Sequence, residues 1–416
     1  MSYAAPVAVG PARRLELGAL LLAVERAAPV QAVEALAEEL ARVMAADHVG
    51  FLMADYGGTG LARLVRAGPA VGTDDGSQWV PIEGTPQGRV LRTQRVHIEP
   101  SGAGAWFYAP VTDRGEALGV LELRLAAPPD EATAADAALA GHALAYVVIA
   151  NSRYTDLYER AQRTLPLDLA AEIQRRLLPA SFTCEAAQCT IAGFLEPAAT
   201  AAGDTFDYSL SRGALHATLT DAMGHDLSAA QLASLVVASL RNSRRRGYEV
   251  VEQAHQANQD LLDHTSSDQF VTGLLLRVDL ASGQARLVNA GHPVPYLLRD
   301  GEVTQLPHSG DPPFGVIAAA YLDYAFHLQA GDRLLLVTDG MLERNASRLD
   351  VPTELHATRD LHPRELVQHL TRRVTAAVGG PLHDDATVLC VDWHGGMDTQ
   401  RHVGSGADPS RASRPL

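Results

Sequence analysis

The sequence has few basic residues, and this shortage excludes one class of partner. Asp and Glu together number 49 against 34 for Lys and Arg, which gives a formal net charge of -15. Proteins that bind nucleic acid neutralise its phosphates with an excess of Lys and Arg. The one dense basic run, residues 244–246, is too short to reverse the balance. We therefore expect no nucleic-acid partner.

Cysteine is also scarce, with three residues (Cys184, Cys189 and Cys390) and no Cys-x-x-Cys motif. An odd number without close pairs predicts neither a disulfide framework nor a zinc site. No cysteine begins the Cys-x5-Arg loop with which some phosphatases hold phosphate. A reducing cytoplasm is the expected setting.

Long apolar runs are missing as well. The longest, residues 138–150, is shorter than a bilayer requires and is interrupted by Gly141 and His142. The first residues lack the basic-then-apolar order of a signal peptide. We expect the run to be the buried face of a helix, and we expect a cytoplasmic protein with no membrane partner.

The length of 416 residues predicts two folded units with linkers. In the first, apolar residues recur at helical spacing over residues 15–44, and Pro29 divides them into two helices. Two strand-like runs within residues 106–125 flank the turn triplet Asp113-Arg114-Gly115, which predicts a hairpin. A helical stretch over 132–159 follows.

This order of helices, antiparallel sheet and exit helix resembles a GAF domain over residues 14–155, behind a disordered start at 1–13. The resemblance implies a module that senses a ligand or a partner. A purely structural or dimerising role remains open.

The second half contains acidic residues in contexts that hold a carboxylate rigidly. Asp204 and Asp207 follow Gly203, which permits a close backbone approach. Alternation over residues 215–221 places Asp221 at the inner end of an apolar strand face. A carboxylate there is costly unless something pairs with it, and a metal ion is the simplest partner.

Two more acidic segments follow. Asp339 ends a continuous aliphatic run, which predicts a strand buried on both faces. Asp384 and Asp385 open a further strand. Carboxylates brought together without basic neighbours repel one another, and divalent cations remove that conflict. Oxygen-only ligation favours Mg²⁺ or Mn²⁺ over zinc.

Taken together, the series AGDTFDY, TDAMGH, NAGH, TDG and HDDATV resembles the PPM/SpoIIE phosphatase family, in particular its RsbU-like group. The resemblance covers residues 165–393. It implies an α+β protein whose residues 183–394 form a four-layer α-β-β-α sandwich. It also implies a metal-dependent protein serine/threonine phosphatase.

Carried over by position, Asp221 matches the family's metal-bridging aspartate, and the Ala222 carbonyl would contact one of two ions. Asp204, Asp339 and Asp384 match the remaining carboxylate ligands. Two Mn²⁺ or Mg²⁺ ions would lower the pKa of a bridging water and hold the phosphoryl oxygens for its attack. No covalent phosphoenzyme is then needed.

Other residues of these motifs have more than one interpretation. Asp385 is interpreted as an acid that orients or caps, with direct ligation as the alternative, and Asp207 either orients waters or caps a turn. Gly340 follows the third aspartate. Asn289 and His292 are explained by a tight turn, while the resemblance allows His292 to act as an acid or phosphate contact.

The segment between the two halves, residues 156–182, contains an amphipathic helix over 167–178 with Leu169, Ile173 and Leu177 on one face. It looks like the helix that precedes the phosphatase domain in RsbU-like proteins, although an ordinary connector fits the periodicity equally. We expect a homodimer through the helices of residues 132–178. The polar tail, 395–416, is expected to be disordered.

The resemblance implies a bacterial signalling phosphatase, regulated by the GAF-like half, that acts on a phosphorylated anti-sigma-factor antagonist. One departure is Asp226, where relatives carry glycine, because it adds a charge beside the metal loop. Two rivals stay open. The chain could be a catalytically weak regulatory protein that docks a partner, or a phosphatase for a small molecule.

Overall fold

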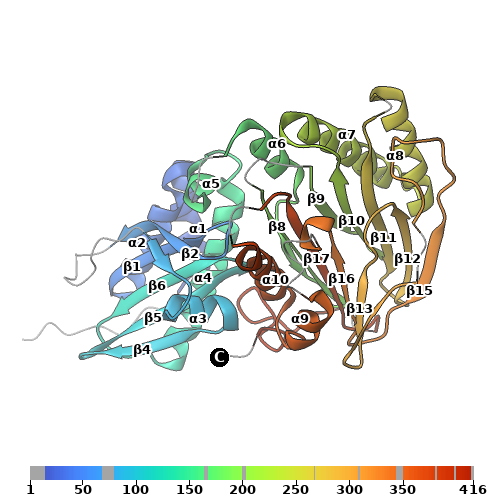
Figure 1. Cartoon of the computed structure of the whole chain (residues 1–416). Coiled ribbons are helices and arrows are strands. Elements are labelled where there is room, and N and C mark those ends of the chain that lie inside the picture. Colours follow the sequence, from blue (N-terminus) through green and yellow to red (C-terminus); the bar gives the residue numbers. More distant parts are fainter. Residues whose placement is uncertain are drawn as a thin grey trace, which may run out of the picture. The chain divides into compact units, whose positions relative to one another are not determined.

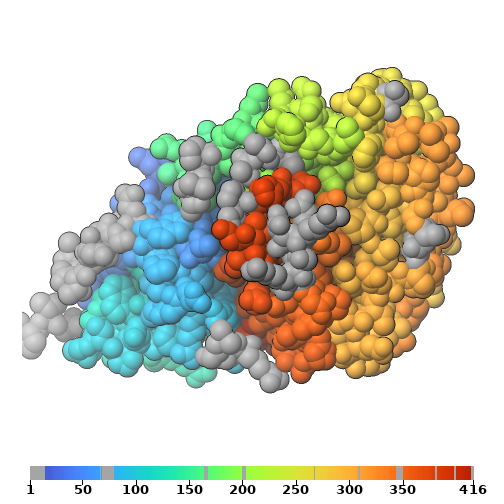
Figure 2. Space-filling view, in the orientation of Figure 1, coloured from blue at the N-terminus to red at the C-terminus, as the bar shows by residue number. Residues whose placement is uncertain are grey.

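The computed structural model describes residues 15–67, 79–163, 167–198, 203–266, 268–307, 310–342, 350–379, 382–397 and 400–413. They belong to two compact units: the chain up to residue 165 together with the segment from 403 onward, and residues 166–402. Figure 1 shows the elements of each unit, and Figure 2 shows one face of the same molecule in space-filling form.

The first unit is built on a six-stranded antiparallel sheet of order β3-β2-β1-β6-β5-β4. Its strands are β1 (Ala46–Ala54), β2 (Gly60–Ala67), β3 (Trp79–Pro81), β4 (His97–Ser101), β5 (Gly104–Asp113) and β6 (Glu116–Leu125). One face packs on the helices α1 (Leu17–Arg26), α2 (Ala32–Met44) and α4 (Glu131–Asn151). The other packs on α3 (Pro86–Thr93).

Two local predictions are confirmed in this unit. A 3₁₀ turn at Pro29–Gln31 separates α1 from α2. The β5–β6 hairpin turns at Arg114 and Gly115, whose φ angles are 45° and 82°. Positive φ at both positions is the backbone of a turn that matches the twist of paired strands.

The helical stretch expected over 132–159 is two helices in the structure, because α4 ends at Asn151 and α5 (Leu157–Gln162) begins later. Between them the Thr155 hydroxyl accepts a hydrogen bond from the Leu157 N–H, a local bond that competes with helix continuation. By length and composition alone α4 could cross a membrane, but much of it, including Ala137, Ala140 and Leu144, is buried in the fold.

The tail differs from the predicted disorder over residues 400–413, which form turns. The Gly115 N–H donates to the Gly406 carbonyl. A Cβ at Gly406 would lie 2.0 Å from the Thr112 carbonyl oxygen, so only glycine fits this passage. Composition does not reveal such a contact, because it depends on a single glycine.

The second unit has two antiparallel sheets. The five-stranded sheet has the order β15-β12-β11-β10-β9, and the six-stranded sheet has the order β14-β13-β16-β17-β8-β7. The strands are β7 (Thr183–Glu185), β8 (Cys189–Glu196), β9 (Thr205–Leu210), β10 (Ala214–Ala222), β11 (Val271–Asp279), β12 (Gln284–Ala290), β13 (Tyr296–Arg299), β14 (Glu302–Gln305), β15 (Asp323–His327), β16 (Arg333–Val337) and β17 (Ala386–Trp393).

Helices cover both outer faces of this pair of sheets. The helices α7 (Asp226–Arg245) and α8 (Val250–His264) pack on the five-stranded sheet, as Figure 1 shows. The helices α9 (Val351–Ala357) and α10 (Pro363–Val378) pack on the six-stranded sheet. Between the sheets, inward-facing residues of β10 and β17 share one core, which includes Leu215, Leu219, Leu389 and Val391. The predicted α-β-β-α sandwich is confirmed.

The predicted linker is divided between the two units. Tyr158 of α5 lies in the core of the first unit. The helix α6 (Leu169–Leu177) packs on α7 of the second unit, where Ala170 contacts Ala230. The second unit therefore starts earlier along the chain than the predicted boundary at residue 183.

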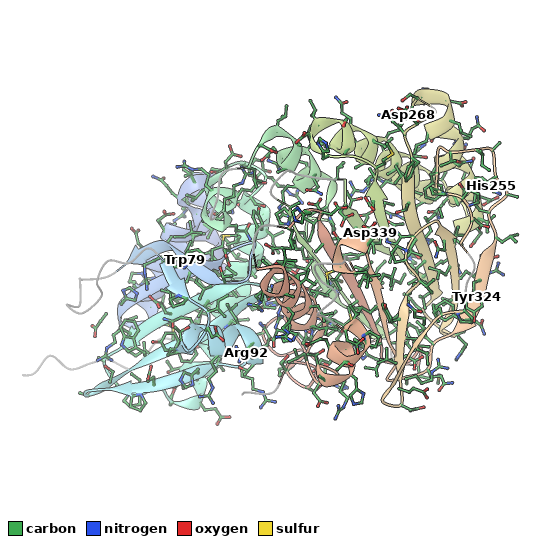
Figure 3. All side chains as sticks on the ribbon, in the orientation of Figure 1. Trp79, Arg92, His255, Asp268, Tyr324 and Asp339 are labelled. Atoms are coloured by element: carbon green, nitrogen blue, oxygen red, sulfur yellow. The ribbon has the colours of Figure 1, made fainter. Side chains whose placement is uncertain are left out.

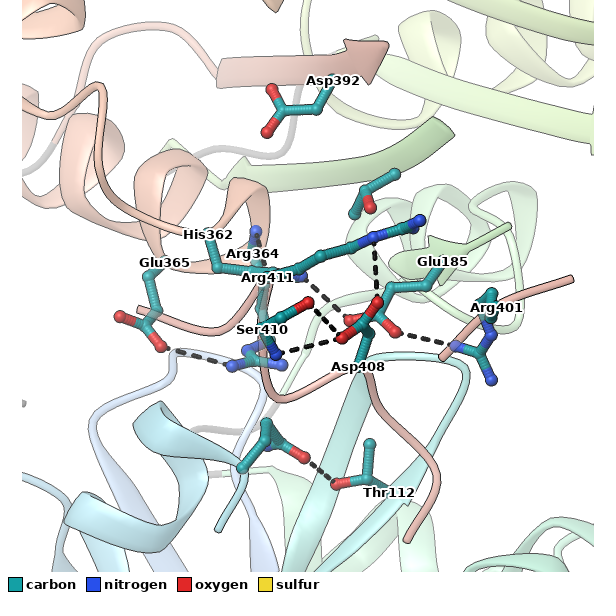
Figure 4. A network of polar contacts seen from close by, with 12 residues as sticks. Thr112, Glu185, His362, Arg364, Glu365, Asp392, Arg401, Asp408, Ser410 and Arg411 are labelled. Atoms are coloured by element: carbon teal, nitrogen blue, oxygen red, sulfur yellow. Dashed lines mark hydrogen bonds and ion pairs between the residues drawn. The ribbon is translucent and has the colours of Figure 1, made fainter. Parts of the chain in front are cut away.

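Two buried charged residues of the second unit, Glu185 and Arg333, have charged partners. Glu185 of β7, fully buried, accepts a hydrogen bond from Arg401 at 2.7 Å and lies 3.2 Å from His362 (Figure 4). Arg333 of β16 makes a two-point pair with Asp392 of β17. Burying one charge without its partner would be strongly unfavourable, so these pairs constrain how the strands assemble.

Candidate metal centre

All of the predicted acidic ligands lie at one end of the sandwich. Asp204 precedes β9 and Asp221 lies near the end of β10, while Asp339 follows β16 and Asp384 precedes β17. Since β9 pairs antiparallel with β10, and β16 with β17, the start of one strand meets the end of the next. Figure 3 labels Asp339 at this end.

Two glycines let the acidic segments approach. A Cβ at Gly203 would lie 2.4 Å from the Ala222 carbonyl oxygen, and a Cβ at Gly340 would lie 2.0 Å from the Asp385 carbonyl oxygen. Neither distance is compatible with a side chain. The close passage of Asp204 beside β10, and of Asp339 beside Asp385, therefore requires glycine.

Asp204 is fully buried and is held by neutral donors. Its Oδ2 accepts from the hydroxyls of Thr338 at 2.7 Å and Thr387 at 2.6 Å. Burial, followed by the charges of Asp221 and Asp385, raises its pKa well above the ordinary value, and the two hydroxyls oppose this rise. Charge on Asp204 is thus unfavourable unless a cation lies nearby.

Asp221 is half-buried, and its pKa is raised to about 7. Burial is the main cause, and the charges of Asp339, Asp384 and Asp385 add to it. These couplings show that side chains from separate segments lie close together. Along the described chain, neither Asp204 nor Asp221 forms an ion pair, and the sequence contains no lysine.

The exposure of the acids is graded. Asp204 is buried, Asp221 and Asp384 are half-buried, and Asp339 is exposed. The cluster therefore opens to solvent on the Asp339 side, which is where a ligand would enter.

The carboxylates are oxygen ligands of the kind that hard divalent cations prefer. Within the described ranges, no three His, Cys, Asp or Glu side chains converge closely enough to hold a single metal ion. Mg²⁺ is commonly bound by one or two carboxylates and keeps several waters. Oxygen donors with excess negative charge, and with no thiol or imidazole among the four acids, suit that mode of binding.

Asp207 lies outside this cluster. It is on the opposite face of β9 from Phe206, and its carboxylate pairs with Arg241 at 3.0 Å and Arg244 at 2.9 Å, both from α7. Arg241 also donates to the Leu177 carbonyl at the end of α6. Asp207 therefore links α7 to β9, and Arg241 extends this link to the end of α6.

Asp385 is buried, and both of its oxygens accept hydrogen bonds. The Ala198 N–H donates to Oδ1 at 2.8 Å, and the Gln174 amide donates to Oδ2. The same Gln174 amide also donates to the Asp204 carbonyl at 2.9 Å. A helix that precedes the sandwich therefore contacts two acidic segments at once.

Sequence reasoning missed Gln174, Thr338 and Thr387. The apolar spacing of residues 167–178 drew attention to Leu169, Ile173 and Leu177, yet buried Gln174 makes the contact. The available signal in the sequence was a polar residue, Gln174, next to the apolar face of this helix. Thr338 directly precedes Asp339, and Thr387 is part of the HDDATV motif. The sequence alone could therefore have predicted that both threonines lie near the acids.

Asn289 and His292 form a closed turn. The Asn289 side chain accepts from the His292 N–H at 2.8 Å and donates to the His292 carbonyl at 2.9 Å. The imidazole lies 2.8 Å from the Thr272 hydroxyl. Burial lowers the pKa of His292 to about 3, which favours the neutral imidazole near pH 7.

Asp226, the first residue of α7, has a φ of 59°. This left-handed conformation costs little for glycine and more for other residues. The expected glycine at this position in relatives is thereby explained. The carboxylate lies 2.7 Å from the imidazole of exposed His225, beside the loop that follows Asp221.

Comparison with known proteins agrees with this geometry. The family model described as Stage II sporulation protein E (SpoIIE) matches residues 211–394, and the GAF domain model matches residues 29–150. The second unit is a SpoIIE domain of the PPM phosphatase type, and the first is a GAF domain. Both resemblances are confirmed. Asp204 and α6 lie before the residues that the SpoIIE model matches.

Individual relatives cover part of the chain. Phosphoserine phosphatase RsbP of Bacillus subtilis (strain 168) is 27% identical over 188 residues, which are 44% of this chain and 46% of RsbP. The chain thus spans about half the length of this curated relative.

Two solved structures also align. The RsbU and RsbW domains of Rv1364c from Mycobacterium tuberculosis align with 26% identity and a TM-score of 0.45, over 50% of this chain and 61% of that one. The catalytic domain of the serine/threonine protein phosphatase PstP, solved with two manganese ions, aligns with 21% identity and a TM-score of 0.39, over 49% of this chain and 98% of that one.

The contacts of Gln174 predict that its amide positions the acids of the SpoIIE domain. Replacing Gln174→Met keeps the length of the side chain but leaves a buried carboxylate and carbonyl without their donor, which costs about 1–3 kcal/mol. We expect the Mn²⁺ concentration for half-maximal activity to rise at least about tenfold, as measured by titration of phosphatase activity. Gln259→Met, an exposed glutamine of α8, is the control. An unchanged metal requirement in Gln174→Met would contradict this role.

The backbone of Asp226 predicts the order of two substitutions. Asp226→Gly and Asp226→Ala remove the same carboxylate, so their difference in stability isolates the positive φ. We expect Asp226→Ala to be less stable than Asp226→Gly by about 1 kcal/mol, as measured from urea denaturation midpoints. Equal stability of the two variants would show that the backbone at this position is not strained.

Proposed function

We propose that the SpoIIE domain is a protein serine/threonine phosphatase that uses two Mn²⁺ or Mg²⁺ ions. The observation that carries the proposal is the gathering of Asp204, Asp221, Asp339 and Asp384, buried to differing degrees, while no described arginine pairs with Asp204 or Asp221. Such an arrangement is costly unless cations bind there. Membership of the PPM type supports the same conclusion.

Each residue of the site would have a distinct part. The charge of Asp221 acts on Asp204, and the charges of Asp339 and Asp384 act on Asp221, so Asp221 would be shared between the ions, with the Ala222 carbonyl as a neutral ligand. Asp204, fixed by Thr338 and Thr387, would serve one side, and Asp339 and Asp384 the other. When bound, the ions would make hydroxide available near neutral pH and neutralise the phosphoryl oxygens.

The supporting chain residues would keep these ligands in place. Gln174 would hold Asp385 and the main chain of Asp204, and Gly203 and Gly340 would allow the strands to meet. Asp385, both of whose oxygens accept hydrogen bonds within the fold, would orient its neighbours. Asn289 and His292 would shape the adjoining turn.

For the substrate, we propose a phosphorylated anti-sigma-factor antagonist in the bacterial cytoplasm, with the GAF domain as the regulator. This rests on the RsbU-like motifs and on similarity to RsbP, which is named a phosphoserine phosphatase. A catalytically weak docking protein is the rival, and the experiment below separates the two.

Metal-dependent hydrolysis tests the proposal. The full chain should hydrolyse p-nitrophenyl phosphate and a phosphoserine peptide in the presence of Mn²⁺ and lose the activity when EDTA is added. Asp221→Asn should lower kcat/KM at least about a hundredfold, because the shared ligand loses its charge. Asp279→Asn, at the last residue of β11 and at the opposite end of the sheet from Asp221, should match the wild type. A folded chain that is silent with both Mn²⁺ and Mg²⁺ would favour the docking protein.

We also propose that the chain is a homodimer through α4. Ala135, Leu139, Tyr146 and Ile149 are exposed along α4, and their spacing of four, seven and three residues follows a heptad. No charged residue occupies this line between Ala135 and Ile149. An uncharged, self-complementary stripe favours a second copy as its partner.

Sedimentation tests this pairing. The wild type should sediment at twice the mass of the chain, and Leu139→Glu combined with Ile149→Glu should sediment as a monomer. Ile98→Glu, a comparably exposed residue of β4, should remain dimeric. A monomeric wild type, or a dimeric double variant, would rule out the α4 stripe.

A further inference from the structure

Large exposed apolar side chains of the second unit gather at the end that carries the acids. In the described part of this unit, eight such residues are exposed, and six of them lie at that end. We call these six, which are 38% to 69% exposed, the apolar rim: Met223, Leu227, Val316, Ile317, Leu322 and Leu342. Chance placement would spread them over both ends and the helices.

Main-chain contacts fix the rim beside the acids. Met223 comes two residues after Asp221, and its N–H donates to the Phe270 carbonyl at 3.0 Å. The Leu342 N–H donates to the Asp339 carbonyl at 2.7 Å. Rim residues therefore adjoin two of the four candidate ligands directly.

The segment with Val316 and Ile317 lies at the same end of the five-stranded sheet. Phe314 pairs with Val271 in two main-chain hydrogen bonds, and Val271 pairs with Ala222. Neighbouring strands are about 4.8 Å apart, so this segment starts about 10 Å from the strand that carries Asp221.

Hydrogen bonds hold the main chain of the rim in place. Asn258 of α8 accepts from the Gly315 N–H at 2.8 Å and donates to the Ile317 carbonyl at 3.0 Å. The Leu322 N–H donates to the Asp311 carboxylate. The backbone is thus held while the apolar side chains of Val316 and Ile317 remain 42% and 53% exposed. Such a patch on a fixed backbone is typical of a recognition surface.

We propose that the apolar rim binds the residues that flank the phosphorylated serine or threonine of the protein substrate, and that the enzyme selects segments with apolar flanks. This inference rests on the proposed function. A phosphate placed between Asp221 and Asp339 would bring its neighbouring residues beside the rim, because the rim adjoins these two acids. Apolar flanks would remove Val316 and Ile317 from water, whereas charged or amide flanks would be desolvated without a partner.

The rim also gives the enzyme a means to distinguish a phosphorylated protein segment from a small phosphate ester. With its cations bound, the acidic cluster would contact only the phosphoryl group, which all substrates share. Selection must then come from surface outside the cluster, and in the described structure that surface includes the six exposed apolar side chains of the rim.

Two short phosphoserine peptides of equal charge test the proposal, one with Leu and Val around the phosphoserine and one with Ser and Gln at the same positions. For the wild type with Mn²⁺, kcat/KM should favour the apolar peptide at least about tenfold. Val316→Ser combined with Ile317→Ser should reduce this preference to about one, with kcat/KM for p-nitrophenyl phosphate within about twofold of the wild type. Met397→Ser, which removes a 93% exposed side chain beyond the other end of β17, should keep the preference.

Binding separates this proposal from the catalytic one. Fluorescence anisotropy of the labelled peptides with the Asp221→Asn chain should show the same preference, because the phosphate contribution cancels in the ratio. If the peptides are bound with this preference but neither they nor p-nitrophenyl phosphate is hydrolysed by the wild type, the proposed catalysis fails and the rim stands. Equal use and equal binding of the two peptides by the wild type, or a preference that survives the double variant, would overturn the rim.

Discussion

The repulsion among carboxylates at one end of the sandwich is the constraint on which the rest of the second unit depends. Asp204 and Asp221 are brought together although burial and neighbouring acids both disfavour their charges. The fold compensates with neutral donors, the hydroxyls of Thr338 and Thr387, which stabilise a carboxylate without cancelling its charge. Arginines are placed instead on the far side of β9, around Asp207. The uncancelled charge is thereby kept available for cations.

Much of this arrangement was readable in the sequence, because it follows from strong local periodicity. The alternation over residues 215–221 predicted the strand β10 and the inner position of Asp221, and the aliphatic run before Asp339 predicted β16. The hairpin at Arg114 and Gly115 and the helix break at Pro29 were predictable from turn chemistry. The resemblance to PPM and GAF families joined these elements into domains.

Features that depend on long-range side-chain pairing were not predictable. Asp207 stands in the same motif as Asp204, yet its arginine partners are 34 and 37 residues away on a helix. Gln174 and Asp385 are 211 residues apart, so no local pattern links them. A hydrogen bond from the Leu157 N–H to the Thr155 hydroxyl lies between α4 and α5, and Asp226 has a positive φ at the start of α7, and neither has a periodic signal in the sequence.

The position of α6 has a practical consequence for anyone who isolates the phosphatase half. A fragment that begins at Thr183, where the sandwich strands start, would lose Gln174 and leave the buried carboxylate of Asp385 short of a donor. It would also expose Ala230 to solvent and remove the Leu177 carbonyl, which accepts a hydrogen bond from Arg241. Truncation just before Asp168, which caps α6, would retain these contacts, so a fragment that keeps them extends about fifteen residues upstream of the first strand, β7.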